Sequence, residues 1–169
     1  MKNITKFFAL AVVILGFSAS SFAQISATAT ATGTIIGPIA ITKTVDMNFG
    51  NVMTSGTAGT VVLAPAGTRT ATAGASLPPT TGTVAAASFS VTGNQGSTFG
   101  ITLPTTPTTV TSGANTMTVT TFTSTPTPSG TLTGGSATIL VGATLNVGTS
   151  QAAGTYVSAT PFTVTVAYN

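Results

Sequence analysis

The chain has 169 residues with four Lys or Arg, one Asp and no Glu, His, Cys or Trp, which gives a formal net charge of +3. Acid–base catalysis needs a group that titrates near the working pH, nucleophilic catalysis needs a base beside the nucleophile, and zinc needs several Cys, His or carboxylate ligands. A single carboxylate supplies none of these sets. We therefore expect a structural or binding protein that is not an enzyme and holds no metal or cofactor.

The first 23 residues have the pattern of a secretory signal peptide. Lys2 and Lys6 form a positive n-region, residues 7–17 form an apolar core, and Ser21-Phe22-Ala23 offers a cleavage site before Gln24. A membrane anchor needs about 20 apolar residues, and this run is shorter. The pattern predicts export through the periplasm to the cell surface or the medium, with no membrane insertion.

The rest of the chain carries three charged side chains, Lys43, Asp46 and Arg69. No basic patch is present to neutralise phosphates, so we expect no nucleic-acid partner. Lys43 and Asp46 are three residues apart, so in an extended strand they face opposite sides and need not pair. Arg69, between two threonines after a turn, is interpreted as a solvated gatekeeper. Because the chain has no Cys, no disulfide can support the fold.

Apolar residues alternate with threonine, most clearly at residues 162–168. Phe162, Val164, Val166 and Tyr168 share one face there, which is typical of a half-buried strand. Further strands are predicted around Val61 to Leu63, Phe89 with Val91, Phe99 with Ile101 and Leu103, Met117 with Val119, and Ile139 to Val141.

Turn signals separate these strands. They include Gly50-Asn51, Pro65-Ala66-Gly67, Gly93-Asn94, Ser112-Gly113, Gly134-Gly135 and Ala153-Gly154. Proline cannot donate to a central ladder, so Pro104, Pro107, Pro126 and Pro128 mark loops or edges. About eight short strands with frequent turns predict an all-β, antiparallel β-sandwich in preference to a barrel.

Two threonine repeats suggest a second class of function. Thr alternates in 27–32 and again in 116–121, where Thr118 and Thr120 are expected to face outward. Flat arrays of Thr can order water, which would suit a monomeric secreted domain that binds ice; the lack of Trp and carboxylates disfavours glycans. The other explanation is that Thr is simply the solvent-facing strand residue of this chain.

The C-terminal sequence suggests a family. Gly154-Thr155-Tyr156 and the final strand, with Tyr168 penultimate, resemble the end of a chaperone–usher pilin subunit. Residues 46–52, with Asn48-Phe49-Gly50, resemble a segment of archaic-type pilins and spore coat protein U-like domains. Together with Ile41-Thr42-Lys43, these segments also resemble an uncharacterised family of small exported bacterial β proteins. Many of the pilin and coat domains carry a disulfide, which this chain lacks.

The resemblance implies an immunoglobulin-like sandwich that lacks one strand and is completed by strand exchange in a cell-surface filament, a pilus or fimbria. A periplasmic chaperone and an outer-membrane usher would be partners, and further copies of the chain would form the homo-polymer. The exchanged segment would be residues 24–36, ahead of a domain at residues 37–169. The candidate donor face is Ala27, Ala29, Ala31, Gly33 and Ile35. The candidate groove wall is Gly154, Phe162, Val164, Val166 and Tyr168.

Alternatives remain for the segment after the cleavage site. Residues 27–36 could instead be the first strand of a sandwich that is complete in itself. A second donor register would use Ile35 or Ile36 with Ile39 and Ile41, although Gly37-Pro38 interrupts it. Three alanines bury little apolar area, so the donor would bind less tightly than one rich in Val, Leu and Ile.

Overall fold

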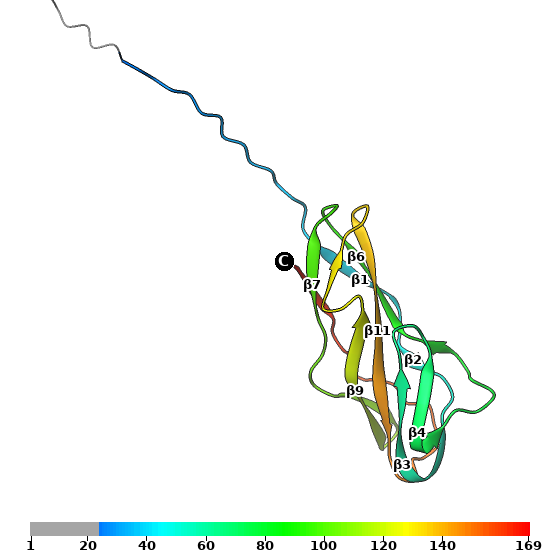
Figure 1. Cartoon of the computed structure of the whole chain (residues 1–169). Helices are drawn as coiled ribbons and strands as arrows, with labels where there is room; N and C mark the ends of the chain where they lie inside the picture. Colours follow the sequence, from blue (N-terminus) through cyan, green and yellow to red (C-terminus); the bar gives the residue numbers. More distant parts are fainter. Residues whose placement is uncertain (1–23) are drawn as a thin grey trace, which may run out of the picture. The chain divides into compact units, whose positions relative to one another are not determined.

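The computed structural model describes residues 24–169, so the predicted signal peptide lies outside the described residues. The fold is contained in one unit, Ile35–Asn169, and every regular element of the described chain is a strand (Figure 1). The strands are β1 (Ala40–Val45), β2 (Asn48–Phe49), β3 (Met53–Leu63), β4 (Arg69–Ser76), β5 (Val84–Ala85), β6 (Ala87–Thr92), β7 (Thr98–Thr102), β8 (Thr108–Ser112), β9 (Asn115–Thr125), β10 (Ser129–Thr131), β11 (Ser136–Val147) and β12 (Thr165–Tyr168).

Two antiparallel sheets form the sandwich, and a short β2–β5 pair accompanies them. In the larger sheet β11 is central: its first half pairs with β6, its second half pairs with β3, and β9 pairs along the opposite edge. β1, β4 and β8 are the outer strands of this sheet, and β10, β7 and β12 form the smaller one. The predicted all-β antiparallel sandwich is therefore confirmed.

Strand number and length differ from the prediction of about eight short strands. The described residues hold twelve strands, of which β3, β9 and β11 are 11, 11 and 12 residues long. Thr121 adopts a positive φ of 50°, and the β9–β11 register shifts between Gly142 and Thr144. This irregularity lets β9 continue where sequence alternation breaks. A prediction based on alternation alone ends the strand at such a point.

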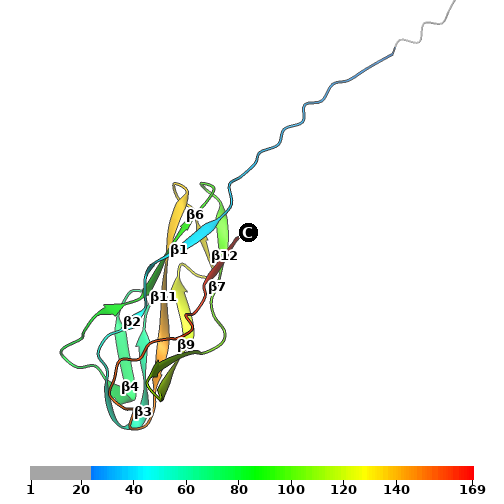
Figure 2. The ribbon, with the colours of Figure 1, turned by 180° about the vertical axis from the view of Figure 1, so that it is seen from behind.

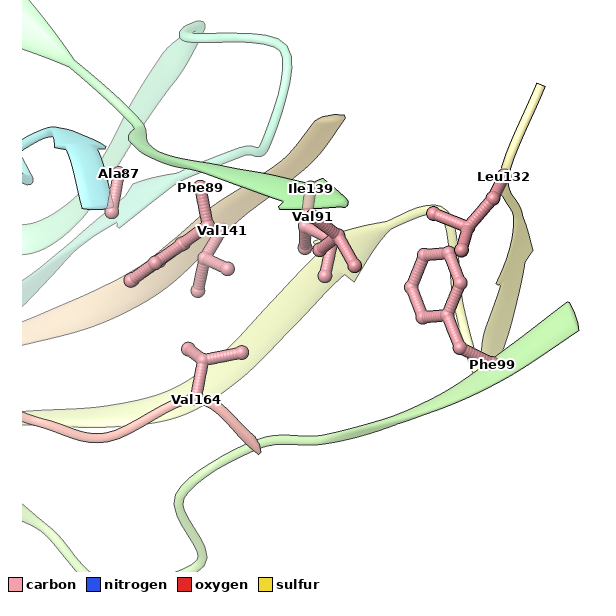
Figure 3. Close-up of a cluster of buried hydrophobic side chains, with 8 residues drawn as sticks. All are labelled: Ala87, Phe89, Val91, Phe99, Leu132, Ile139, Val141 and Val164. Atoms are coloured by element: carbon pink, nitrogen blue, oxygen red, sulfur yellow. The ribbon is translucent and has the colours of Figure 1, made fainter. Parts of the chain in front are cut away.

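The main core lies between the two sheets. Phe89 and Val91 of β6 and Ile139 and Val141 of β11 face Val164 from the opposite layer. Figure 3 shows the Val164 side chain pointing toward Phe89 and Val141. Phe99 and Leu132, both fully buried, extend this cluster at one end. A second cluster, centred on Val61, Val119 and Leu145, fills the other half.

The alternating burial of the C-terminal segment is confirmed. Val164 is buried, Phe162, Val166 and Tyr168 are half-buried, and the intervening residues are exposed. Backbone pairing begins only at Thr165, so Phe162 and Val164 precede β12. The four singled-out prolines all lie outside strands, as predicted.

Two expectations about charged residues are wrong. The Lys43 ammonium lies 2.6 Å from Asp46 Oδ1, because the β1–β6 register shifts between Lys43 and Val45 and β1 ends before Asp46. Simple alternation therefore does not hold across this pair. Arg69 is half-buried, and its guanidinium donates to the carbonyl oxygens of Phe49 and Asn51, the latter at 2.9 Å. It is a structural clamp and not a solvated gatekeeper.

Candidate functional site

Two strand edges on one side of the sandwich have no strand partner among the described residues. β1 pairs only with β6, and β12 pairs only with β7. The two strands contact one another, as Figure 2 shows. An unpaired edge presents free N–H and C=O groups on which another strand can add.

The two edges run in opposite directions. The Tyr168 hydroxyl, at the end of β12, donates to the carbonyl oxygen of Gly37, just before β1, over 3.1 Å. β12 therefore runs toward the point from which β1 departs. A strand placed between the edges would be antiparallel to one of them and parallel to the other.

Apolar side chains along these edges are only partly covered. They pack against the main core but are not fully buried, and they are Ile39, Ile41, Phe162, Val166 and Tyr168. The layer behind them is closed: Val91 and Val141 are completely buried, and Val164 is 7% exposed. The edges thus form a shallow apolar rim over a sealed core.

Four of the five predicted groove-wall residues lie together: Phe162, Val166 and Tyr168 on this rim, and Val164 in the closed layer behind it. Phe162 has its ring centroid 4.9 Å from that of Phe122 and 6.4 Å from that of Phe89. Val164, Val166 and Tyr168 continue the same face. Gly154 does not lie with them, because it sits in the loop before β12 beside the side chain of Ser112.

Sequence reasoning placed the Tyr168 ring in the core but missed the role of its hydroxyl. The backbone N–H of Asn94 donates to this hydroxyl over 2.7 Å, in addition to the bond from the hydroxyl to Gly37. A Cβ at Gly93 would collide with the hydroxyl. The oxygen therefore joins β12, the β6–β7 turn and the start of the domain. In the sequence, the Gly93-Asn94 turn signal is the feature that could have pointed to this contact.

The candidate donor residues lie in a segment without strand pairing. Residues 24–36 have no regular secondary structure, and all of them are exposed. Ile25 is 95% and Ile35 100% exposed. The alternative in which residues 27–36 are the domain's own first strand is therefore not what the structure shows. Ile39 and Ile41 pack on the domain's own core, which removes the second donor register.

The Asn48-Phe49-Gly50-Asn51 motif forms a corner. Gly50 has φ of 65°, and its N–H donates to Asn48 Oδ1 over 2.8 Å. Asn51 donates from its backbone and side chain to the carbonyls of Thr81 and Thr80. With the Arg69 clamp, these bonds account for the motif by structure alone.

A row of uncharged hydrogen-bonding side chains crosses the outer face of the larger sheet. Register partners on five adjacent strands place side by side Thr109, Thr118, Asn146, Thr60 and Thr72. Asn146 Nδ2 donates to Thr118 Oγ1 at 3.3 Å and to Thr120 Oγ1 at 2.9 Å, and the Thr60 and Thr72 hydroxyls are 2.6 Å apart. The sheet thus holds these hydroxyls in a fixed array.

A cavity of about 590 Å³ opens where β7 and β12 part. Pairing at Thr102–Thr165 and at Thr111–Val157 brackets it, and residues 103–109 and 159–163 line it with Thr, Pro, Leu103 and Phe162. Its lining has no charged side chain. Among residues 24–169, no set of three or more acidic, His or Cys side chains is arranged to hold a metal ion.

Comparison with known proteins gives one match. A family model described as a domain of unknown function, DUF4402, covers residues 39–168. The chain belongs to this family. No curated protein and no solved structure matches the chain. The DUF4402 match begins just before β1, so it includes both open edges and leaves residues 24–36 outside. Within residues 24–169, no helix is long and apolar enough to span a membrane.

Proposed function

We propose that this DUF4402 protein is a non-enzymatic structural subunit of a bacterial cell-surface filament, and that it polymerises by strand exchange. Residues 24–36 of one copy would add to the open β12 edge of the next copy. A periplasmic chaperone would hold that edge before assembly, and an outer-membrane usher would export the growing polymer.

The observation that carries the proposal is the presence, in one chain, of an unpaired strand-like segment and an unpaired apolar edge. Residues 24–35 alternate small or apolar side chains with polar ones, and all of residues 24–36 are exposed. β12 has a free edge and a half-buried apolar face. A strand added there would satisfy backbone groups and cover the rim in one step. An exposed uncharged edge would otherwise risk aggregation.

The pilin resemblance supports the same assignment. It rests on the C-terminal strand with Tyr168 penultimate and on the Asn48-Phe49-Gly50 segment. The structure explains that segment as a corner clamped by Arg69. The C-terminal strand and the N-terminal extension are therefore the features that support strand exchange.

Deletion of residues 24–36, with the signal peptide kept, tests the proposal. The deleted chain keeps both edges and the whole core, so we expect it to be exported and to remain monomeric or chaperone-bound on size-exclusion chromatography. The intact chain, expressed in the same cells, should form polymers. Polymers formed by the deleted chain would refute strand exchange through this segment.

A second candidate is a monomeric secreted domain that binds ice, favoured by the five-strand row of Thr and Asn side chains. Such a surface presents one polar side chain from each strand, and neighbouring strands lie about 4.8 Å apart. Thr118→Lys should then abolish inhibition of ice recrystallisation without changing the melting temperature. Thr163→Lys, an exposed position outside the larger sheet, is the control. Equal activity of wild type and Thr118→Lys would exclude this face as the ice-binding surface.

A further inference from the structure

The small side chains of the extension match the rim at the β12 edge in number and in spacing. Between Ile25 and Ile35, the face shared by odd-numbered residues carries only Ala27, Ala29, Ala31 and Gly33. These four positions span six residue steps, or about 20 Å in an extended strand. Residues 162–168 also present four inward side chains over six steps.

The closed core explains why small side chains suit this edge. Val91 and Val141 have no exposed surface, and Val164 has 7%. A side chain added over Val164 therefore finds no deep cavity to fill, and a large one would have to displace side chains that are already packed. The rim is bulkiest at its ends, where Phe162 and Tyr168 stand.

We propose that the β12 edge selects the small-residue face of the extension of a second copy, in one register antiparallel to β12. Gly33 lies opposite Phe162, Ala31 opposite Val164, Ala29 opposite Val166 and Ala27 opposite Tyr168. The antiparallel direction continues the arrangement of β10, β7 and β12. This inference rests on the proposed strand exchange and adds to it the register and the size limit.

The register places the one residue without a side chain against an aromatic ring. Gly33 has no side chain and meets Phe162, whose ring is already in contact with two other phenylalanine rings. Ile25 and Ile35 fall just beyond Tyr168 and Phe162, where they cap the two ends of the paired stretch. The small side chains at residues 27–33 therefore suit a shallow site. Longer side chains in the middle of this segment weaken the binding of the extension to the β12 edge.

Substitution at the centre of the face tests the size limit. Ala31→Leu in the full chain should lower the fraction of protein in polymers about tenfold, because an overpacked side chain over Val164 weakens the contact. Thr30→Leu, which adds a similar side chain on the outward face, should leave polymer yield unchanged. If Ala31→Leu polymerises as well as or better than wild type, the size limit is wrong.

Cysteine pairs test the register, since the natural chain has no Cys. The register sets Thr30 opposite Thr165, and both positions are exposed. Polymers of a Thr30→Cys, Thr165→Cys chain, treated with a mild oxidant, should resist boiling until a reductant is added. Matched chains with Thr28→Cys or Thr32→Cys in place of Thr30→Cys should collapse, because those positions are two residues out of register.

The outcomes separate this inference from the proposed function. If wild type forms no polymers at all, strand exchange itself fails. If wild type polymerises but the Thr28 or Thr32 pair cross-links in place of the Thr30 pair, or no pair does, exchange stands and this register is overturned.

Discussion

At the residue scale, the corner formed by Asn48, Phe49, Gly50 and Asn51 depends on one backbone conformation and one cation. Gly50 has a positive φ, and a Cβ there would meet the Thr81 carbonyl oxygen and Val84. Arg69 donates to carbonyls on both sides of Gly50. The corner therefore tolerates neither a side chain at residue 50 nor the loss of the guanidinium.

Gly50→Ala should destabilise the chain more than Gly67→Ala. Both glycines have positive φ, so each substitution costs about 1 to 2 kcal/mol. Only Gly50 has neighbours in the way of a Cβ, which adds about 1 to 3 kcal/mol of overpacking. Urea unfolding of the two purified variants measures the difference. Equal losses of unfolding free energy in the two variants would contradict the overpacking expected at Gly50.

Arg69→Met should cost about 1 to 3 kcal/mol of unfolding free energy, because two carbonyl oxygens lose a charged donor. Lys43→Met is the matched control. Its ion pair with Asp46 is exposed, so we expect a loss below about 1 kcal/mol. Denaturant midpoints of both variants report the result, and a larger loss for Lys43→Met would contradict the clamp assigned to Arg69.

At the element scale, β12 is held by one strand and by the hydroxyl at its end. Four residues pair with β7, and the Tyr168 oxygen bonds to both Asn94 and Gly37. The hydroxyl thus fixes the end of β12 against the segment that precedes β1. Loss of the oxygen should loosen this end while the aromatic ring stays packed.

Tyr168→Phe tests this role, with an expected loss of about 1 to 3 kcal/mol for two hydrogen bonds. Hydrogen exchange at the Asn94 amide should become faster, because its acceptor is gone. Tyr156→Phe removes a hydroxyl that bonds to Gln151 and Ala152 in the loop before β12, so it should leave exchange at Asn94 unchanged. Unchanged exchange at Asn94 in Tyr168→Phe would contradict the assignment.

Sequence patterns predicted the strand cores well and the irregular points poorly. The alternation at residues 162–168 identified the apolar face of β12, because burial on one side imposes a period of two. The bulge at Thr121 and the β1 register shift that brings Lys43 to Asp46 depend on tertiary pairing, which a local pattern does not record. Arg69 was misjudged for a related reason: its acceptors are backbone carbonyls about twenty residues away, which no side-chain motif reveals.

The candidate site was predicted in part. Four of the five wall residues pack in or against the main core, because they alternate along one extended segment, residues 162–168. The prediction for Gly154 rested only on its spacing from Tyr168 in the pilin resemblance. In the structure, Gly154 lies in the loop before β12, beside the side chain of Ser112. The open β1 edge was not foreseen, since the sequence does not state which strands end a sheet.

At the scale of the whole molecule, the described chain is a sandwich in which the outer strands β1 and β12 lie against one another, each with an edge that has no strand partner, and an extension that makes no strand of its own. The proposed strand exchange would cover the β12 edge and order the extension in one step. It would also give head-to-tail growth, because each copy would supply one donor segment and one acceptor edge and the contact would repeat without closing on itself.

The most direct test is an SDS gel of material sheared from the surface of cells expressing the full chain, with unheated and boiled samples side by side. Strand-exchanged polymers resist the detergent until heat separates the strands. We expect a ladder of high-mass bands in the unheated lane that collapses to a single monomer band on boiling. A lone monomer band in both lanes would contradict the proposed filament and would turn attention to the threonine face of the larger sheet.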